Sequence, residues 1–319
     1  MDLGMKWLGK SVCIMGTACA NAQTRQVLPE TTPPPVRLEQ LQQLLNDDKS
    51  GLKDLAKRLV GDNNTNRLFY FPTHDEPATP ATWGFKYEDV DFASTDGTHL
   101  HGWFLPAKGK ADFKERKGTV VFSHGNAGSL GHHIGFVLWL AEAGYNVFMY
   151  DYRGFGKSGG EVDRSGMIED AKSAFKYVAN RPDVDAKKLI SYGHSLGGAK
   201  SVAAIVEGKI IGLKAIVIDG TFASYQAMAR LVGGQFGADL ITDEFSPKDF
   251  IGKVTGTPVL VIHGDHDEVV PFIQGKQLFD LANEPKTFFE VKDGSHGNSL
   301  ARDNGAYRIR MLDWLEGVM

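Results

Sequence analysis

The chain has 319 residues, of which 42% are hydrophobic and 23% are charged, values typical of a soluble globular protein. Its net charge of −4 and its lack of a basic cluster argue against a nucleic-acid partner. No stretch approaches the roughly 20 apolar residues that a membrane-spanning helix needs. Both cysteines, Cys13 and Cys19, lie in the first twenty residues, so disulfides and cysteine-bound metals are excluded from the rest of the chain.

Residues 1–22 have the pattern of a bacterial export signal. Lys6 and Lys10 precede a short apolar run, and A-x-A cleavage sites end at Ala20 and Ala22. Residues 16–19 also resemble a lipobox, in which Cys19 would carry a lipid and attach the chain to a membrane. We therefore predict an exported protein, with lipid attachment as a variant. An unprocessed tail, which would leave the protein in the cytoplasm, is the alternative.

Residues 23–65 are predicted to form a linker and an N-terminal helical extension. The proline run at 31–35 is typical of an extended spacer. Leucines at helical spacing across 38–60 predict one or two short amphipathic helices. The principal domain is then predicted to span residues 66–319.

The principal domain has the pattern of an α/β fold. Alternating residues around the turn at 95–97 predict an antiparallel hairpin. Apolar runs then predict further strands at 119–123, 146–152, 189–192, 215–219, 258–263 and 286–291. Helical patterns lie between or after them near 132–143, 165–180, 199–207, 272–282 and 306–318. Continuous apolar strands between helices predict a mostly parallel, twisted sheet of about eight strands with helices on both faces.

Residues 221–253 are the one long excursion between strands and predict a short lid. Eight apolar residues in it are candidates either for core packing or for the wall of an acyl-binding site: Phe222, Tyr225, Met228, Leu231, Val232, Phe236, Leu240 and Ile241.

A G-x-S-x-G motif centred on Ser195 lies between a strand-like run at 188–192 and a helical pattern at 199–207. A sharp strand–turn–helix connection of this kind lifts a serine hydroxyl out of the sheet and points helix N–H groups at a developing oxyanion. We therefore predict that Ser195 is a nucleophile. The alternative is a serine in an ordinary turn with incidental glycines.

A serine nucleophile needs a histidine base, which in turn needs an acid to orient it. Of the ten histidines, His296 alone follows both Ser195 and the acid-bearing loop 263–271 at the end of a strand, the order that this motif requires. His194 is expected to point away from the nucleophile. Three others are expected on surface hairpins: His74, His99 and His101.

Asp267 is the favoured acid because it lies beyond the tight His-Gly turn, and Asp265, Asp293 and Asp219 are the alternatives. Consecutive residues on one loop rarely converge on one ion, so the His and Asp residues of 263–267 do not predict a metal site. Neither a metal nor a cofactor is expected.

Two backbone N–H groups are predicted to form an oxyanion hole, those of Leu196 and of Asn126 in the loop at 123–128. The G-x-G-x-x-G string at 154–159 does not predict a dinucleotide site, because no helix opens directly after it. Asp151 and Arg153 are expected to form a buried ion pair near the site.

With these motifs in order, the chain resembles the α/β-hydrolases, in particular the branch of monoglyceride-lipase-like, serine-aminopeptidase-like and acyl-thioesterase-like enzymes with a minimal cap. The resemblance covers residues 66–319 and rests on segments 96–106, 124–128, 151–158 and 193–197 and on the loops of Asp267 and His296. It implies a triad of Ser195, Asp267 and His296 with Asn126 and Leu196 as oxyanion donors. The chain departs from these relatives at 219–224, where they usually have a serine-proline turn.

The sequence therefore predicts a serine hydrolase that cleaves a small-molecule carboxylic ester or thioester through an acyl-enzyme intermediate. A serine peptidase of the aminopeptidase type is the first alternative, because amide cleavage uses the same triad. A non-catalytic binding protein on the same fold is the second.

Overall fold

The computed structural model describes residues 65–110 and 112–319. The predicted export signal, Cys13, Cys19 and nearly all of the predicted helical extension therefore lie outside the described residues. None of the helices in the described ranges is both long enough and apolar enough to cross a bilayer.

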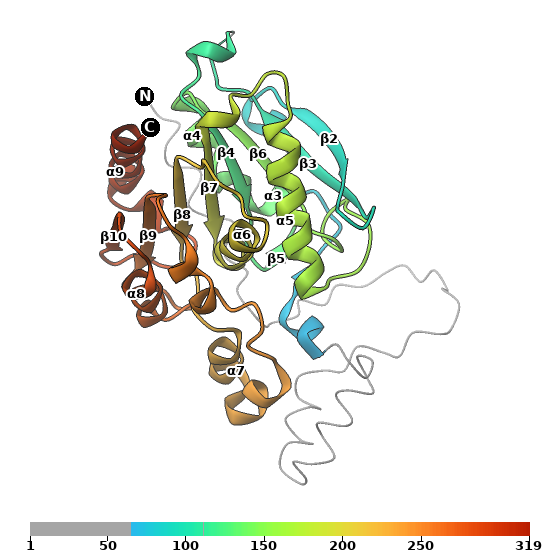
Figure 1. Cartoon of the computed structure of the whole chain (residues 1–319), viewed down its shortest axis with the longest axis vertical. Helices are drawn as coiled ribbons and strands as arrows, with labels where there is room; N and C mark the ends of the chain where they lie inside the picture. Colours follow the sequence, from blue (N-terminus) through green and yellow to red (C-terminus); the bar gives the residue numbers. More distant parts are fainter. Residues whose placement is uncertain (1–64, 111) are drawn as a thin grey trace, which may run out of the picture. The chain divides into compact units, whose positions relative to one another are not determined.

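An eight-stranded sheet with the order β10-β9-β8-β7-β4-β6-β3-β2 forms the centre of the described chain (Figure 1). Its strands are β2 Glu88–Ala93, β3 His99–Leu105, β4 Thr119–Ser123, β6 Asn146–Tyr150, β7 Leu189–His194, β8 Ala215–Asp219, β9 Val259–Gly264 and β10 Lys286–Val291. β2, β3 and β6 pair antiparallel, and all other neighbours pair parallel. The predicted mostly parallel sheet is thus confirmed. A separate parallel pair joins β1 Phe71–Pro72 to β5 Ala127–Gly128.

Helices cover both faces of the sheet. They are α3 Leu130–His133, α4 Leu138–Glu142, α5 Arg164–Ala179, α6 Leu196–Glu207, α7 Tyr225–Leu240, α8 Phe272–Leu281 and α9 Arg302–Val318. Short 3-10 turns are η1 Thr65–Phe69, η2 Pro80–Trp83, η3 Phe113–Glu115, η4 Ile134–Phe136, η5 Ala186–Lys188, η6 Pro247–Asp249, η7 Ile251–Lys253 and η8 Ser299–Ala301.

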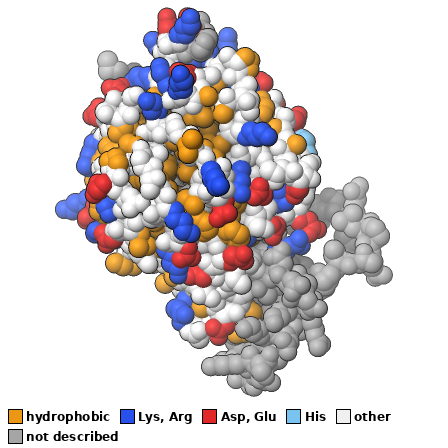
Figure 2. All heavy atoms as spheres, viewed as in Figure 1, with side chains coloured by type: hydrophobic (Ala, Val, Ile, Leu, Met, Phe, Trp, Pro, Cys, Tyr) orange, Lys and Arg blue, Asp and Glu red, His pale blue; other side chains and the backbone are white. Residues whose placement is uncertain are grey.

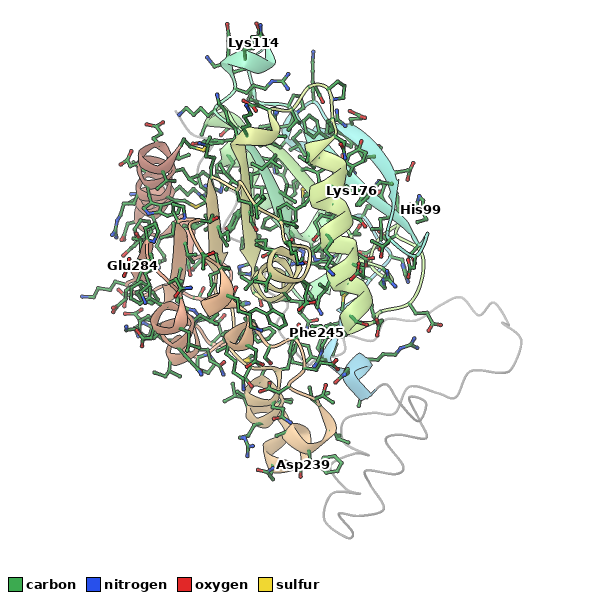
Figure 3. All side chains as sticks on the ribbon, in the orientation of Figure 1. His99, Lys114, Lys176, Asp239, Phe245 and Glu284 are labelled. Carbon is green, nitrogen blue, oxygen red and sulfur yellow. The ribbon has the colours of Figure 1, made fainter. Side chains whose placement is uncertain are left out.

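The central strands are apolar throughout because each buries both of its faces. Val121 of β4 packs in the core layer that contains Val202 of α6, whereas its neighbour Val120 packs in the layer that contains Met311 of α9. All four side chains are completely buried. Figure 3 shows side chains crowded around the sheet and its helices, with Lys176, which is exposed, on α5.

The prediction of a single helix at 132–143 is wrong. The segment instead forms α3, η4 and α4 in succession, with the chain turning at Val137, where φ is −128°. Its buried residues do recur at helical spacing, which is why the pattern predicted one helix. Gly135 weakens a helix interior by about 1 kcal/mol, so tertiary packing decides where the helical turns break.

The excursion at 221–253 contains α7, η6 and η7. Phe222 and Tyr225 at its start are buried core residues, whereas Leu231 and Val232 further along α7 are 57% and 69% exposed. The helix is interrupted at Gly233 and Gly234, and Gly234 has a φ of 59°. The apolar residues that were candidates for core packing or for an acyl-site wall are thus divided between core and surface.

The Asp243 carboxylate closes this excursion on itself. It accepts hydrogen bonds from the Ser224 and Ser246 hydroxyls, both at 2.6 Å, and it pairs with Lys248. Ser224 also caps α7 by accepting from the Ala227 N–H. Burial would raise the pKa of Asp243, but Lys248 and the two hydroxyls outweigh it and lower the pKa to about 2.

Replacing Asp243 with asparagine is expected to lower the free energy of unfolding by about 1–2 kcal/mol at neutral pH, because the lowered pKa measures the stabilisation of the ionised form. A carboxylate with a lowered folded-state pKa stabilises the fold above its unfolded-state pKa of about 4. That contribution is lost as pH falls toward the folded-state value of about 2. Urea denaturation of both proteins at several pH values measures the difference, and a difference independent of pH between 6 and about 2.5 would contradict the assignment.

Candidate active site

Ser195 lies in a sharp turn between β7 and α6, as the motif predicts. Its φ of 54° and ψ of −117° are values that a residue with a side chain rarely adopts. The Ser195 N–H donates to the Asp219 carbonyl at 2.8 Å, which fixes the turn to the end of neighbouring strand β8. The serine is 7% exposed at the end of its strand.

Two glycines of the motif are required by the closeness of the backbone. A Cβ on Gly193 would lie 2.4 Å from the Gly198 nitrogen, and one on Gly197 would lie 1.8 Å from the Ser123 carbonyl oxygen. The first turn of α6 therefore packs directly against the end of β4. This contact places the start of α6 beside the loop that follows β4.

His296 and Asp267 are brought together from the loops after β10 and β9. The His296 Nδ1 lies 2.8 Å from the Asp267 Oδ2, and the Asp267 side chain is completely buried. The other carboxylate oxygen accepts from the N–H groups of Val269 and Val270. Burial would raise the pKa of Asp267, but His296 and the Val270 N–H outweigh it and hold the pKa below its usual value.

The tautomer of His296 follows from this contact. An ionised carboxylate only accepts hydrogen bonds, so Nδ1 of His296 carries the proton that is donated to Asp267. In the neutral imidazole the other nitrogen, Nε2, is then free of a proton and is able to accept one.

Gly220 places the His296 ring beside the Ser195 turn. The carbonyl of the preceding residue, Asp219, accepts from the Ser195 N–H, and a Cβ on Gly220 would lie 3.2 Å from His296 Nδ1. The His194 ring, which precedes the serine, lies 4.8 Å from the His296 ring between centroids. The three predicted residues Ser195, Asp267 and His296 thus come from loops that meet at one edge of the sheet.

The predicted oxyanion donors also lie at this edge. Leu196 is the first residue of α6, where a backbone N–H has no carbonyl partner within the helix. Asn126 lies in the loop between β4 and β5, and its side-chain amide donates to the Phe69 carbonyl at 2.6 Å. The contact between Gly197 and Ser123 sets the two segments side by side.

The alternative acids do not contact His296. Asp265 pairs with His266, and Asp293 lies 3.7 Å from the same imidazole. Asp219 accepts a hydrogen bond from the Tyr192 hydroxyl and lies 3.5 Å from His194 Nδ1.

Two expectations for neighbouring residues were wrong, the surface position of His101 and the ion pair between Asp151 and Arg153. His101 is buried on β3 and contacts Asp89, although it was expected on the surface. Arg153 pairs with Asp170 and Asp96 instead of Asp151. Asp151 accepts from the Leu130 N–H and lies 3.4 Å from His124. In each case a short strand or turn brings a partner from elsewhere in the chain, which sequence proximity does not reveal.

One group in the described ranges offers metal-ligand atoms within 4.8 Å of one another, formed by Asp265, His266 and Asp293. His266 and Asp293 are exposed, and the group lies on the outer side of the acid loop. Exposed acidic clusters are common without a bound ion, so this group does not indicate a metal centre.

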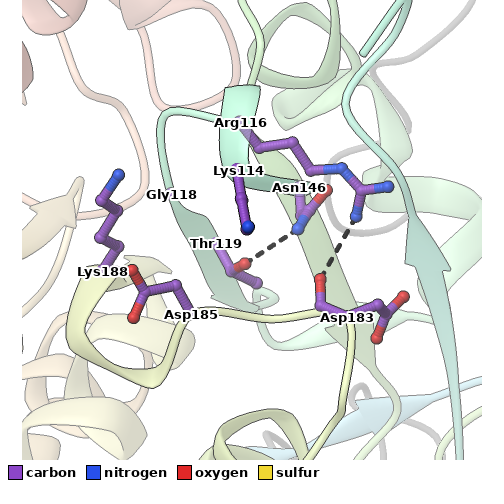
Figure 4. Close-up of a pocket in the computed structure, with 8 residues that line it drawn as sticks. All are labelled: Lys114, Arg116, Gly118, Thr119, Asn146, Asp183, Asp185 and Lys188. Carbon is purple, nitrogen blue, oxygen red and sulfur yellow. Dashed lines mark hydrogen bonds between the residues drawn. The ribbon is translucent and has the colours of Figure 1, made fainter. Parts of the chain in front are cut away.

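A small pocket of about 130 Å³ lies at the opposite edge of the sheet (Figure 4). Thr119 and Asn146, the first residues of β4 and β6, line it and are hydrogen-bonded to each other. Ligands of open α/β sheets bind at the carboxyl ends of the strands, so this pocket is not the expected substrate site. On the face in Figure 2, basic and acidic side chains are mixed, with hydrophobic ones between them.

Two residues at the site were not identified from the sequence. Gly220 leaves room for the His296 ring, and the Glu268 carboxylate accepts from the His296 backbone N–H at 3.2 Å. A glycine directly after a buried strand end is the signal for the first. No pattern in the sequence distinguishes Glu268 from an ordinary surface residue.

Comparisons with known proteins agree with the fold described above. A family model described as serine aminopeptidase S33 matches residues 114–240. The chain is 38% identical to the uncharacterized protein YfhR of Escherichia coli K12, over 78% of this chain and 86% of that protein. It is 31% identical to the α/β hydrolase domain-containing protein WAV2 of Arabidopsis thaliana, over 78% of this chain and 87% of that protein.

A solved structure of the Pyrococcus furiosus esterase Pf2001 superposes on 79% of this chain and 98% of its own, with a TM-score of 0.66 and 20% identity. At that identity, the likeness shows a shared fold. The predicted fold class is thereby confirmed.

Replacing Gly197 with alanine is expected to lower the free energy of unfolding by about 2–3 kcal/mol, because the new Cβ meets the backbone of a buried strand. Gly317 in α9 is a matched control, since a Cβ there meets nothing within 4 Å. Alanine at 317 should leave stability unchanged or raise it by up to about 1 kcal/mol. Equal urea midpoints for the two variants would show that the elbow is not packed as described.

Proposed function

Because the chain belongs to the α/β-hydrolase family, we propose that it is a serine hydrolase that cleaves carboxylic esters or thioesters through an acyl-enzyme intermediate. The observation that carries the proposal is the hydrogen bond of 2.8 Å between the buried Asp267 carboxylate and His296, beside a serine held at positive φ. The esterase among the structural neighbours supports hydrolase activity as well.

In the first step, the Ser195 hydroxyl attacks the acyl carbonyl while His296 Nε2 takes its proton. The tetrahedral intermediate collapses, the bond to the alcohol or thiol breaks, and the imidazolium returns the proton to that leaving group. Water then attacks the acyl-enzyme with the same base, which releases the carboxylic acid and restores the serine.

Asp267 holds His296 in the tautomer that exposes Nε2 and stabilises the imidazolium that forms. The N–H groups of Leu196 and Asn126 donate to the oxyanion, and one such donor is worth about 3 kcal/mol of transition-state stabilisation. This stabilisation arises as charge develops on the carbonyl oxygen, so it raises kcat.

The hydrogen bond from the Ser195 hydroxyl to His296 Nε2, which completes the triad, is part of what we propose. In the part of the chain that the structure describes, that hydroxyl makes no hydrogen bond. Catalytic hydrogen bonds are often long without substrate and tighten in the complex.

A serine peptidase is the second candidate, because the matching family model is described as a serine aminopeptidase. Amide and ester cleavage use the same triad, so the two differ in substrate preference. Turnover of p-nitrophenyl esters of increasing chain length, compared with aminoacyl-anilides, separates them.

The proposal predicts covalent labelling by a fluorophosphonate probe and ester hydrolysis by the wild type, both lost in Ser195→Ala. Ser191→Ala is a matched control, because Ser191 is a buried serine of β7 whose hydroxyl has no hydrogen-bond partner in the described residues. Labelling that persists in Ser195→Ala would place the nucleophile elsewhere, and an unlabelled wild type would favour a non-catalytic binding protein.

Asp267→Asn is expected to lower kcat for esters by about 10³–10⁴-fold, because an amide at this position favours the wrong tautomer of His296. KM should change far less, since the carboxylate acts on the base and not on bound substrate. Asp265→Asn is the control and should keep kcat within about twofold of wild type, because Asp265 contacts His266 and not His296. Comparable losses in both variants would reject Asp267 as the catalytic acid.

A further inference from the structure

Residues 69–72, here called the strap, hold Asn126 from two directions. The Asn126 side-chain amide donates to the Phe69 carbonyl at 2.6 Å, and the Phe71 N–H donates to the Asn126 carbonyl at 3.2 Å. The pairing of β1 with β5 continues this contact along the oxyanion loop. The position of the strap therefore sets the position of Asn126.

Tyr70 anchors the strap to the core. It is 5% exposed, and Phe69 before it is partly buried against the same core, whereas Phe71 after it is 54% exposed. The Tyr70 hydroxyl oxygen accepts from the Arg164 Nε at 3.2 Å and from the Lys200 Nζ at 3.3 Å. Tyr70, which lies between the two strap residues that bond Asn126, is thus the most buried residue of the strap.

Lys200 joins this anchor to the nucleophile helix. It lies four residues after Leu196 on α6, so both residues lie on the same face of that helix. Its completely buried amine also donates to the Arg164 carbonyl at 3.0 Å. Among the described residues, no carboxylate lies within ion-pair distance of this amine.

The burial of Lys200 has a cost that an aliphatic side chain would avoid. Burial, together with the nearby Arg164, lowers the pKa of Lys200 well below its ordinary value. Other residues of α6 that face this core are small or aliphatic, such as Ala203 and Ala204. What the amine adds to this position is its pair of hydrogen bonds to the strap anchor and to Arg164.

We propose that Lys200 and Tyr70 are positioning residues that fix the spacing between the two oxyanion donors. The helix that begins with the Leu196 N–H and the strap that holds Asn126 are joined directly by the Lys200–Tyr70 contact. The oxyanion needs both donors at about 3 Å at the same time, so a small shift of the strap weakens transition-state binding selectively. This inference rests on the proposed hydrolase function.

Tyr70→Phe removes the hydroxyl that accepts from Lys200 and keeps the ring. We expect kcat for a p-nitrophenyl ester to fall by about tenfold while KM stays within about twofold. The affinity for butylboronic acid, whose serine adduct is tetrahedral, should fall by the same factor as kcat. Tyr177→Phe is the matched control, because it removes a hydroxyl that accepts from Arg181 at the far end of α5. It should leave kcat, KM and boronate affinity unchanged.

Lys200→Met tests the same contact from its other side and is expected to lower kcat and boronate affinity in parallel, with KM unchanged. The double variant Tyr70→Phe/Lys200→Met should be no slower than the slower single variant, because each substitution alone already removes the contact between Lys200 and Tyr70. Urea denaturation of each variant identifies the conditions under which it is fully folded for these assays.

Wild-type kcat and boronate affinity in both folded variants would overturn the inference, as would a rise in KM with kcat unchanged. These results differ from a failure of the proposed function. In that case the wild type itself would neither hydrolyse esters nor react with the fluorophosphonate probe.

Discussion

The hydrogen bond from the Ser195 N–H to the Asp219 carbonyl fixes the turn on which the rest of the site depends. A serine at positive φ costs of order 1–3 kcal/mol and persists when the surrounding structure holds it in place. Here β8 supplies the hydrogen bond, and the end of β4 touches the first turn of α6 at Gly197. The strained turn is thus held in place by β8 and β4, the two strands that flank β7 in the sheet.

The parallel sheet explains why residues distant in sequence meet at this turn. The loops after β4, β8, β9 and β10 all leave the sheet at the same edge, because the strands run in the same direction. One loop contributes Asn126, the next Gly220, and the last two Asp267 and His296. A hydrolytic site then needs only short loops, because the strands already align them.

Much of the fold and of this edge followed from sequence patterns. Continuous apolar runs identified the buried strands because both faces of each strand are covered. The glycines on both sides of Ser195 marked the elbow, because the backbone there is too close for a Cβ. The acid was less certain, since Asp265 and Asp267 are separated by one residue and only tertiary contact shows which reaches His296.

Contacts that depend on packing between distant elements could not be predicted in the same way. Arg153 pairs with Asp170 and Asp96 instead of Asp151, although Asp151 is only two residues away in the sequence. The fold, and not the distance along the chain, decides which carboxylate lies beside the guanidinium. Lys200 gives a weak signal, as a lysine in a helix of mostly small and apolar residues, but its contact with Tyr70 spans 130 positions. The turns of α3, η4 and α4 likewise follow the space available against the sheet.

The proposed function depends most on an activated serine that faces two backbone donors. A crystal structure of the protein treated with diethyl p-nitrophenyl phosphate tests this directly. We expect phosphorus bonded to the Ser195 Oγ, with the phosphoryl oxygen about 3 Å from the nitrogens of both Leu196 and Asn126. An adduct on another residue would contradict it. So would an adduct on Ser195 whose phosphoryl oxygen points away from these two nitrogens.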